Sequence, residues 1–147
     1  MTVRQQASKA VIFLLLLLIV PQAREARTYG EASIKNIIAV YDGDTFRANL
    51  EGFPAIIGEN IGIRINGIDT PEMKDKRPHI KALAIKARNY LRARLKEAKE
   101  VKLISLQRGK YFRIVAQVIV DGQDIGQELI KAGLAKPYSG GKKEGWK

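Results

Sequence analysis

Residues 61–72 constrain the fold of this chain most, because there a strand pattern leads directly into a cluster of charged side chains. They read Ile-Gly-Ile-Arg-Ile-Asn-Gly-Ile-Asp-Thr-Pro-Glu. Isoleucine recurs at every second position from 61 to 65, which predicts a strand with one apolar face and Arg64 on the other. Because the apolar face does not need Arg64, and because two carboxylates follow within residues 69–72, this pattern favours a site that holds fixed charges against a ligand.

A purely structural interpretation of residues 69–72 is also available. Asp69 and Glu72 have the spacing of a helix capping box, or Thr70 could be the cap with Pro71 in the first helical position. Against it, residues 73–77 show no apolar helical period, and Pro78 would interrupt a helix that began at Thr70.

A second pair of strands is predicted nearer the start of the chain, at residues 34–41 and 45–50. Asp42-Gly43 between them is typical of a tight hairpin turn, since both residues tolerate positive φ. Asp44 is not required by such a turn, and aspartate is disfavoured at the start of a strand. This misfit suggests a function for Asp44. Residues 51–60 are predicted to be a loop.

The second half of the chain predicts a helix at residues 79–99, from an apolar stripe at three- and four-residue spacing. Strands follow at 101–106 and 111–120, then a turn at Asp121-Gly122 and a short helix at 125–132 that ends at Gly133. The prediction is therefore five strands and at least two helices. Residues 138–147 are basic and rich in glycine, and are either disordered or held down by Trp146.

The first residues resemble a secretory signal peptide. Arg4 and Lys9 precede an uncharged apolar run at residues 10–20, which is too short to cross a bilayer as a helix of about 20 residues. The predicted organisation is a signal peptide or uncleaved anchor at 1–23, a folded domain at 31–139 and a basic tail at 140–147. Either interpretation of the start places the protein outside the cytoplasm, as a secreted or periplasmic protein. The absence of cysteine excludes stabilisation by a disulfide.

The chain is strongly basic, with 26 Lys and Arg against 15 Asp and Glu. Removal of residues 1–23 takes away two basic residues and no acids, which leaves 24 against 15. The excess is consistent with a solubilising surface or with a polyanionic partner, and charge alone does not distinguish nucleic acid from a membrane surface.

Six polar residues lie inside predicted strands or at their ends, where packing alone does not require them. They are Asp44, Arg64, Asp69, Thr70, Glu72 and Arg113. Their oxygen atoms suit Ca²⁺ or Mg²⁺, whereas the lack of cysteine and the single histidine argue against zinc. The two arginines can bind a phosphate, and the glutamate can orient or deprotonate water. These are the groups needed for attack of water on a phosphodiester.

The order of these residues resembles the staphylococcal nuclease (thermonuclease) family. The matching motifs are Val-Tyr-Asp-Gly-Asp-Thr at residues 40–45 and Arg-x₄-Asp-Thr-Pro-Glu at 64–72, with weaker matches at 110–113 and 133–136. The resemblance covers roughly residues 34–138. It implies an α+β, mainly β fold, an OB-like five-stranded barrel with helices packed on it. It also implies a Ca²⁺-dependent phosphodiesterase that acts on DNA and RNA.

The resemblance further implies a role for each matching residue. Ca²⁺ would be held by Asp44, Asp69 and the carbonyl of Thr70. The catalytic set would be Arg64 and Arg113, which bind the phosphate, and Glu72 as general base or water-positioning group. The nucleotide would be contacted by Lys110, Tyr111 and Tyr138. Gly109 and Phe112 stand where the staphylococcal pattern has Asp and Gly.

From the sequence we therefore expect a secreted or periplasmic, monomeric nuclease that hydrolyses DNA and RNA by metal-assisted attack of water. It would have no stable membrane partner if the signal is cleaved. The main alternative is a non-catalytic OB-fold protein that binds nucleic acid, and the presence of all six polar residues argues against it. A membrane-anchored interaction protein is a third possibility, which depends on an uncleaved start.

Overall fold

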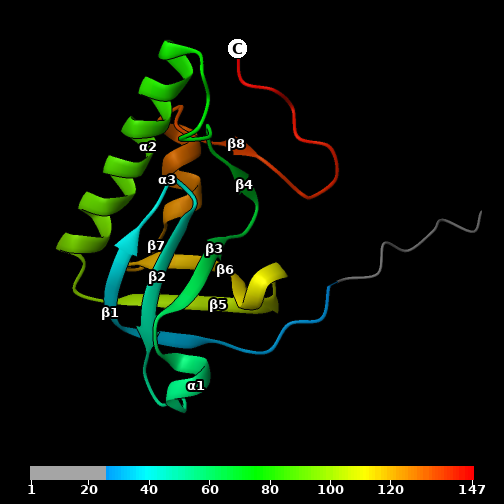
Figure 1. Ribbon diagram of the computed structural model, residues 1–147. Coiled ribbons are helices and arrows are strands. Elements are labelled where there is room, and N and C mark those ends of the chain that lie inside the picture. Colours follow the sequence, from blue (N-terminus) through cyan, green and yellow to red (C-terminus); the bar gives the residue numbers. More distant parts are fainter. Residues whose placement is uncertain (1–25) are drawn as a thin grey trace, which may run out of the picture.

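The computed structural model describes residues 26–147 (Figure 1). The predicted signal peptide at residues 1–23 lies outside the described residues. Within residues 26–147, no helix combines the length and the apolarity that crossing a membrane would require.

Five long strands form a closed barrel of mixed direction. Its strands follow the order β3-β2-β1-β5-β6, and a parallel pairing between β3 and β6 closes the ring. The strands are β1 (Ala32–Val40), β2 (Thr45–Leu50), β3 (Ile61–Ile65), β5 (Val101–Arg108) and β6 (Arg113–Val120). The side chains that alternate inward from them form the core, as the period-two pattern predicts. The OB-like, mainly β fold expected from the sequence is confirmed.

The helices and the short strands lie mainly at the two ends of the barrel. Figure 1 shows α2, α3 and the β4–β8 pair towards one end, and α1 at the opposite end. β4 pairs with β8, and β7 pairs with the end of β6. The bounds are α1 (Ala55–Gly58), β4 (Ile68–Asp69), α2 (Pro78–Glu97), the 3-10 helix η1 (Lys110–Phe112), β7 (Gln123–Asp124), α3 (Ile125–Lys131) and β8 (Lys136–Pro137).

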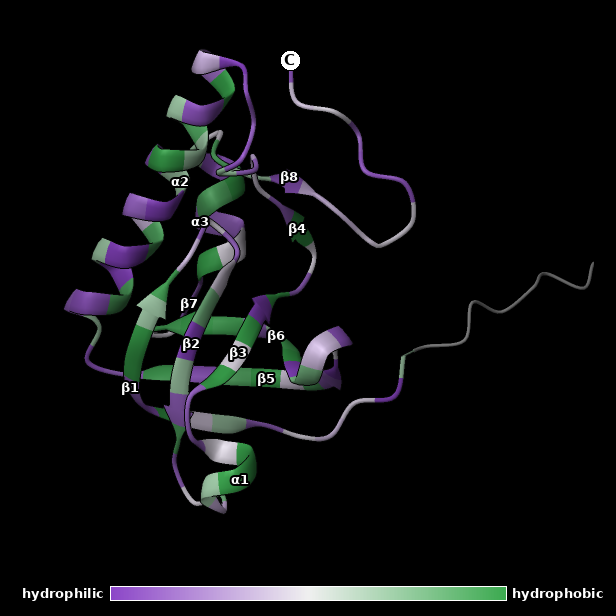
Figure 2. Cartoon of the chain, in the orientation of Figure 1, coloured by the Kyte–Doolittle hydropathy of each residue, from purple (hydrophilic) through white to green (hydrophobic). Residues whose placement is uncertain are grey.

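The long helix α2 packs through the apolar stripe that the sequence predicts, and Figure 2 shows hydrophobic and hydrophilic residues interspersed along it. Its buried residues are Ile80, Ala84, Ala87, Leu91 and Leu95. Pro78 begins this helix. Proline suits the first turn, because the N–H that it lacks would have no partner within the helix there.

The connection between β1 and β2 corrects one prediction. Asp42 and Gly43 do not form a tight turn with positive φ; neither residue is in the left-handed region, and residues 41–44 make a longer link. Glycine is needed at 43 for a different reason. A Cβ there would lie 2.7 Å from Cβ of Ala87 and 2.9 Å from Cγ2 of Thr70, so only glycine lets the link approach α2 this closely.

Three other predictions also need correction. The capping-box interpretation is wrong, because Asp69 ends strand β4 and the next helix along the chain begins only at Pro78. The predicted loop at 51–60 contains the short helix α1. The fifth long strand begins at Arg113 instead of residue 111, because η1 places Tyr111 and Phe112 in the left-handed region at φ 57. The short helix predicted at 125–132 is confirmed as α3, with Gly133 following it at φ 69.

Candidate active site

Strand pairing places Asp44 beside Arg64. Thr45, the first residue of β2, pairs with Arg64 of β3, and the amide of Ile65 donates to the carbonyl of Asp44 at 2.9 Å. The residue that precedes β2 therefore lies at the same level of the barrel as the arginine of β3. Register, which the alternating pattern specifies, fixes this part of the site.

A turn after β3 returns the chain so that Asp69 reaches the same place. Gly67 has φ 81, a conformation that favours glycine, and the amide of Asn66 donates to Ala116 of β6 at 2.8 Å. Nη2 of Arg64 donates to the carbonyl of Ile68 at 3.0 Å, which fastens the returning segment to β3. The pairing of Asp69 with Lys136 then holds this segment against β8.

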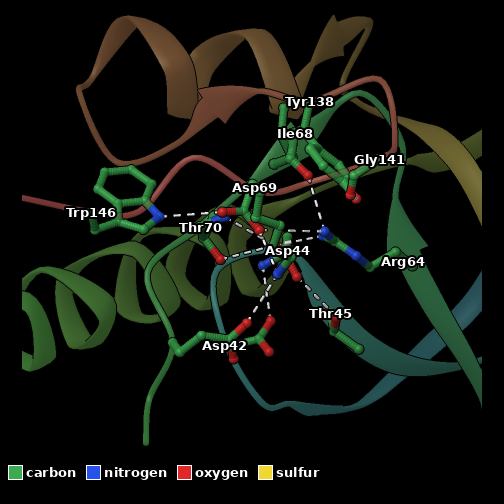
Figure 3. A network of polar contacts seen from close by, with 12 residues as sticks. Asp42, Asp44, Thr45, Arg64, Ile68, Asp69, Thr70, Tyr138, Gly141 and Trp146 are labelled. Atoms are coloured by element: carbon green, nitrogen blue, oxygen red, sulfur yellow. Dashed lines mark hydrogen bonds and ion pairs between the residues drawn. The ribbon is translucent and has the colours of Figure 1, made fainter. Parts of the chain in front are cut away.

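The carboxylate of Asp44 is held by several donors (Figure 3). Its Oδ2 accepts from the amide of Thr70 at 3.1 Å and from the Thr70 hydroxyl at 3.0 Å. Its Oδ1 accepts from the hydroxyl of Thr45 at 3.0 Å. Both Asp44 and Thr70 are buried, so these bonds fix the carboxylate in one orientation.

Arg64 lies between the two buried aspartates. Its Nη1 is 2.5 Å from Oδ2 of Asp44, and its Nη2 is 3.9 Å from Oδ1 of Asp69. The side chain of Arg64 is only 17% exposed, and those of the aspartates are 8% and 7% exposed. A guanidinium stays charged at any working pH, so it offsets part of the repulsion between two carboxylates in a poorly solvated place.

Asp42 adds a titratable group to this end of the barrel. Its Oδ1 accepts from the amide of Asp44 at 3.0 Å. Burial, and next the negative charge of Asp44, raise the pKa of Asp42 to about 6. Its charge therefore varies near neutral pH.

The C-terminal residues supply two contacts that the site prediction did not include. Nζ of Lys143 lies 2.7 Å from Oδ1 of Asp69 and 3.0 Å from Oε1 of Glu72. Nε1 of Trp146 donates to Oδ2 of Asp69 at 3.2 Å (Figure 3). Of the two interpretations of the tail, the one in which Trp146 holds it down is therefore confirmed. Nothing in the sequence singles out Lys143 from the neighbouring lysines.

Partial burial would lower the pKa of Lys143, but its contacts with the carboxylates of Asp69 and Glu72 outweigh this effect and raise that pKa. Glu72 itself is exposed, with 65% of its side chain accessible. Lys143 lies between Glu72 and the buried Asp69 and forms an ion pair with each.

Arg113 lies apart from this network. It pairs with Gly62 rather than with Arg64, its Nε donates to the carbonyl of Lys110 at 3.2 Å, and its guanidinium lies 5.8 Å from the ring centre of Tyr111. Tyr111 is 88% exposed. The structure thus groups Arg113 with η1 and leaves the four residues Asp44, Arg64, Asp69 and Thr70 as the compact part of the site.

Tyr138 follows β8, close to the turn between β3 and β4. Its amide donates to the carbonyl of Gly67 at 2.8 Å, and its hydroxyl donates to the carbonyl of Gly141 at 2.9 Å.

The residues present fit a hard divalent cation. Oδ1 of Asp69 is buried without a properly aligned hydrogen bond, although Lys143 and Arg64 lie within ion-pair distance. A carboxylate oxygen of this kind can serve as a ligand for a cation. Among the described residues, no group of three His, Cys, Asp or Glu side chains is close enough to hold a metal ion. A cation here would rely on two carboxylates, a backbone carbonyl and water, which suits Ca²⁺ better than zinc.

The fold and site together define an OB-like barrel that carries two buried carboxylates and a partly buried arginine at one end. The family model described as "Staphylococcal nuclease homologue" matches residues 62–145, more than half of the chain. The chain belongs to the staphylococcal nuclease family.

Two curated relatives are similar to more than half of this chain. One is "Probable endonuclease C19F8.04c" of Schizosaccharomyces pombe, 34% identical over 89 residues, which cover 56% of this chain and 38% of the relative. The other is "Probable endonuclease LCL3" of Phaeosphaeria nodorum, 34% identical over 95 residues, which cover 58% of this chain and 30% of the relative. The matched region therefore spans less than two fifths of either relative.

Proposed function

We propose that this protein is a Ca²⁺-dependent nuclease that hydrolyses phosphodiester bonds of DNA and RNA. The observation that carries the proposal is the convergence of Asp44, Asp69, Thr70 and Arg64 at one end of the barrel. Membership of the staphylococcal nuclease family and the endonuclease names of the two relatives support it.

In this proposal Ca²⁺ is held by Asp44, Asp69 and the carbonyl of Thr70. When bound, the cation supplies a positive charge that polarises a phosphate oxygen and stabilises the charge that develops during attack. The hydrogen bonds from Thr45 and Thr70 keep the Asp44 carboxylate in place before any ligand arrives.

Arg64 and Glu72 act on the phosphate and on water. The contacts of Arg64 with Asp44 and Ile68 involve two of its five N–H donors, and the proposal assigns remaining donors to phosphate oxygens. Glu72 is exposed, and its carboxylate can orient a water molecule or accept its proton.

The exposed residues of η1 would contact nucleotides beside the cleaved bond. Lys110 and Arg113 offer cations to phosphates, and Tyr111 offers a ring on which a base can stack. Tyr138 lies next to the Gly67 turn, and its ring could likewise stack on a base. The strongly basic composition supports a polyanionic substrate. We also propose that the protein acts outside the cytoplasm, because residues 1–23 resemble a signal peptide.

The test is hydrolysis of DNA and RNA by the purified protein with Ca²⁺ or with a chelator. We expect cleavage only with Ca²⁺, and a loss of at least about a hundredfold in the Glu72→Gln variant, which retains the shape but not the charge. Glu51→Gln is the matched control, because Glu51 is an exposed glutamate that follows β2, far along the chain from Glu72.

Equal cleavage with and without chelator would contradict the metal site. A Glu72→Gln variant that cleaves at the rate of the Glu51→Gln control would remove Glu72 from the catalytic set. Binding of nucleic acid without cleavage under any of these conditions would favour the alternative, a non-catalytic OB-fold binding protein.

A further inference from the structure

Residues 139–147, which we name the C-terminal strap, follow β8 and turn back to contact the buried Asp69. Gly140 and Gly141 have φ of 100 and 84, values that favour glycine, and the strap changes direction there. Figure 2 shows the strap coloured mainly hydrophilic. It is therefore not held in place by burial of an apolar face.

Specific polar contacts hold the end of the strap near the site. Trp146 donates from Nε1 to Asp69 at 3.2 Å, and its carbonyl accepts from Nη1 of Arg77 at 2.7 Å. Nζ of Lys136 lies 4.8 Å from the centre of the Trp146 ring and donates to the carbonyl of Gly145 at 3.2 Å. These contacts bring the strap to one particular carboxylate, that of Asp69.

Lys143 takes the place in this arrangement that a cation would take. Its ammonium lies 2.7 Å from Oδ1 of Asp69 and 3.0 Å from Oε1 of Glu72, and so bridges a buried and an exposed carboxylate. Oδ1 of Asp69 is also the buried oxygen that lacks an aligned hydrogen bond. An ammonium and a divalent cation cannot both occupy the space in front of this oxygen.

The strap packs loosely enough to leave. A cavity of about 180 Å³ lies between it and β8, lined by Asp69, Lys136, Pro137, Tyr138 and residues of the strap. Lys143 is 44% exposed. Displacement of the strap would break the partly buried ion pair between Lys143 and Asp69, the more exposed pair with Glu72 and a few hydrogen bonds, and the main apolar group that it would expose is Trp146.

We propose that Lys143 and Trp146 belong to the functional site and set its affinity for divalent cations. The strap covers Asp69 with an internal ammonium, and a divalent cation displaces it, so cation binding and release of the strap are coupled. The coupling is reciprocal: a weaker strap gives tighter cation binding, and a bound cation gives a freer strap. The inference rests on the metal site of the proposed function.

The protein carries its own reporter, because Trp146 is the single tryptophan of the chain. Half-buried Trp146 should become more exposed when Ca²⁺ is added, which shifts its fluorescence emission to longer wavelength and increases quenching by acrylamide. Calorimetry measures Ca²⁺ binding independently of this signal. Neither readout requires catalysis.

The decisive comparison is between Lys143→Met and Lys142→Met. Both remove one charge from the strap, but only Lys143 has an ion pair with Asp69. We expect the Kd for Ca²⁺ to fall about fivefold in Lys143→Met and to change less than about twofold in Lys142→Met, the scale of a partly exposed ion pair. Without Ca²⁺, the emission of Lys143→Met should already be shifted towards longer wavelength.

Each failure has a distinct meaning. If Ca²⁺ binds the parent and both variants with one Kd, or if saturating Ca²⁺ leaves Trp146 emission unchanged, the metal site stands and the competition is wrong. If calorimetry detects no Ca²⁺ binding to any of the three proteins, the proposed metal site is wrong and this inference is overturned with it.

Discussion

Replacement of Arg64 by lysine tests whether this residue acts through its positive charge alone or also through the planar fork of N–H donors on its guanidinium. The alternation of β3 alone indicates that Arg64 is not needed by the apolar face, which predicts a small effect on stability. The structure changes this expectation. Nη1 pairs with Asp44 while Nη2 donates to the carbonyl of Ile68, so one guanidinium satisfies two separate buried acceptors.

The magnitude follows from these contacts. Lysine has one nitrogen on a flexible stem, so it can keep the ion pair with Asp44 or the hydrogen bond to Ile68, but not both. Loss of one hydrogen bond from a charged donor at a poorly exposed site costs about 2 kcal/mol of folding free energy. In the folded variant, loss of a preorganised donor to the phosphate should lower the rate of hydrolysis by about a hundredfold.

Urea denaturation gives the free energy of unfolding, and single-turnover cleavage of DNA gives the rate. Arg92→Lys is the control, because Arg92 is an exposed arginine on α2 whose one hydrogen bond to protein is a long 3.4 Å contact. We expect it to change stability by less than about 0.5 kcal/mol. If Arg64→Lys matches the stability of this control, the fork does not hold both acceptors and the reasoning from geometry is refuted. If it loses stability but cleaves at the parent rate, Arg64 is a structural residue only.

Two further predictions concern packing and pH. Gly43→Ala should cost about 2 kcal/mol of stability in urea, because its Cβ would lie 2.7 Å from Ala87, whereas Gly145→Ala, with no atom within 4 Å, should cost less than about 0.5 kcal/mol; equal effects would contradict the packing argument. Arg94 donates to both oxygens of Glu128 at 2.8 and 2.9 Å, and this hydrogen bonding lowers the pKa of Glu128 below its usual 4.5. Glu128→Gln should therefore lose about 1 kcal/mol at pH 7, and the difference from the parent should shrink as pH falls below 4.5 through the lowered pKa; a difference independent of pH between 7 and 2 would exclude the charge as its cause.

The barrel could be predicted because its sequence signals are local and mutually consistent. β2 and β3 show the period-two pattern of strands with one buried face, and the predicted bounds of β2 agree with the structure. The antiparallel register between them follows from keeping both apolar faces inward, and this register alone brings Asp44 to Arg64. The part of the site built from neighbouring strands was therefore accessible from sequence.

Backbone conformation that depends on packing between residues far apart in the chain could not be predicted from the sequence. The sequence predicts that Gly43 is a turn residue. In the structure its lack of a side chain instead allows close packing against Ala87 and Thr70, which are 44 and 27 positions away in sequence. Phe112 stands in the left-handed region where glycine would be expected, and it helps to turn the chain so that Arg113 faces Lys110 and Tyr111. The sequence shows that this position departs from the family pattern, but not which way the arginine then points.

The two buried aspartates differ in the residues that contact their oxygens, and these residues come from different parts of the chain. The oxygens of Asp44 are satisfied by Thr45, Thr70 and Arg64, which all belong to the barrel or its turns. The closest contacts of the Asp69 oxygens are with Lys143 and Trp146, more than 70 positions later in sequence, and Arg64 lies farther away at 3.9 Å. Asp44 is thus organised whenever the barrel is folded, whereas the surroundings of Asp69 change when the strap moves. In the proposed metal site, Asp44 would be a permanent ligand and Asp69 a conditional one, so changes to the strap would alter the affinity for a cation without any change to the barrel.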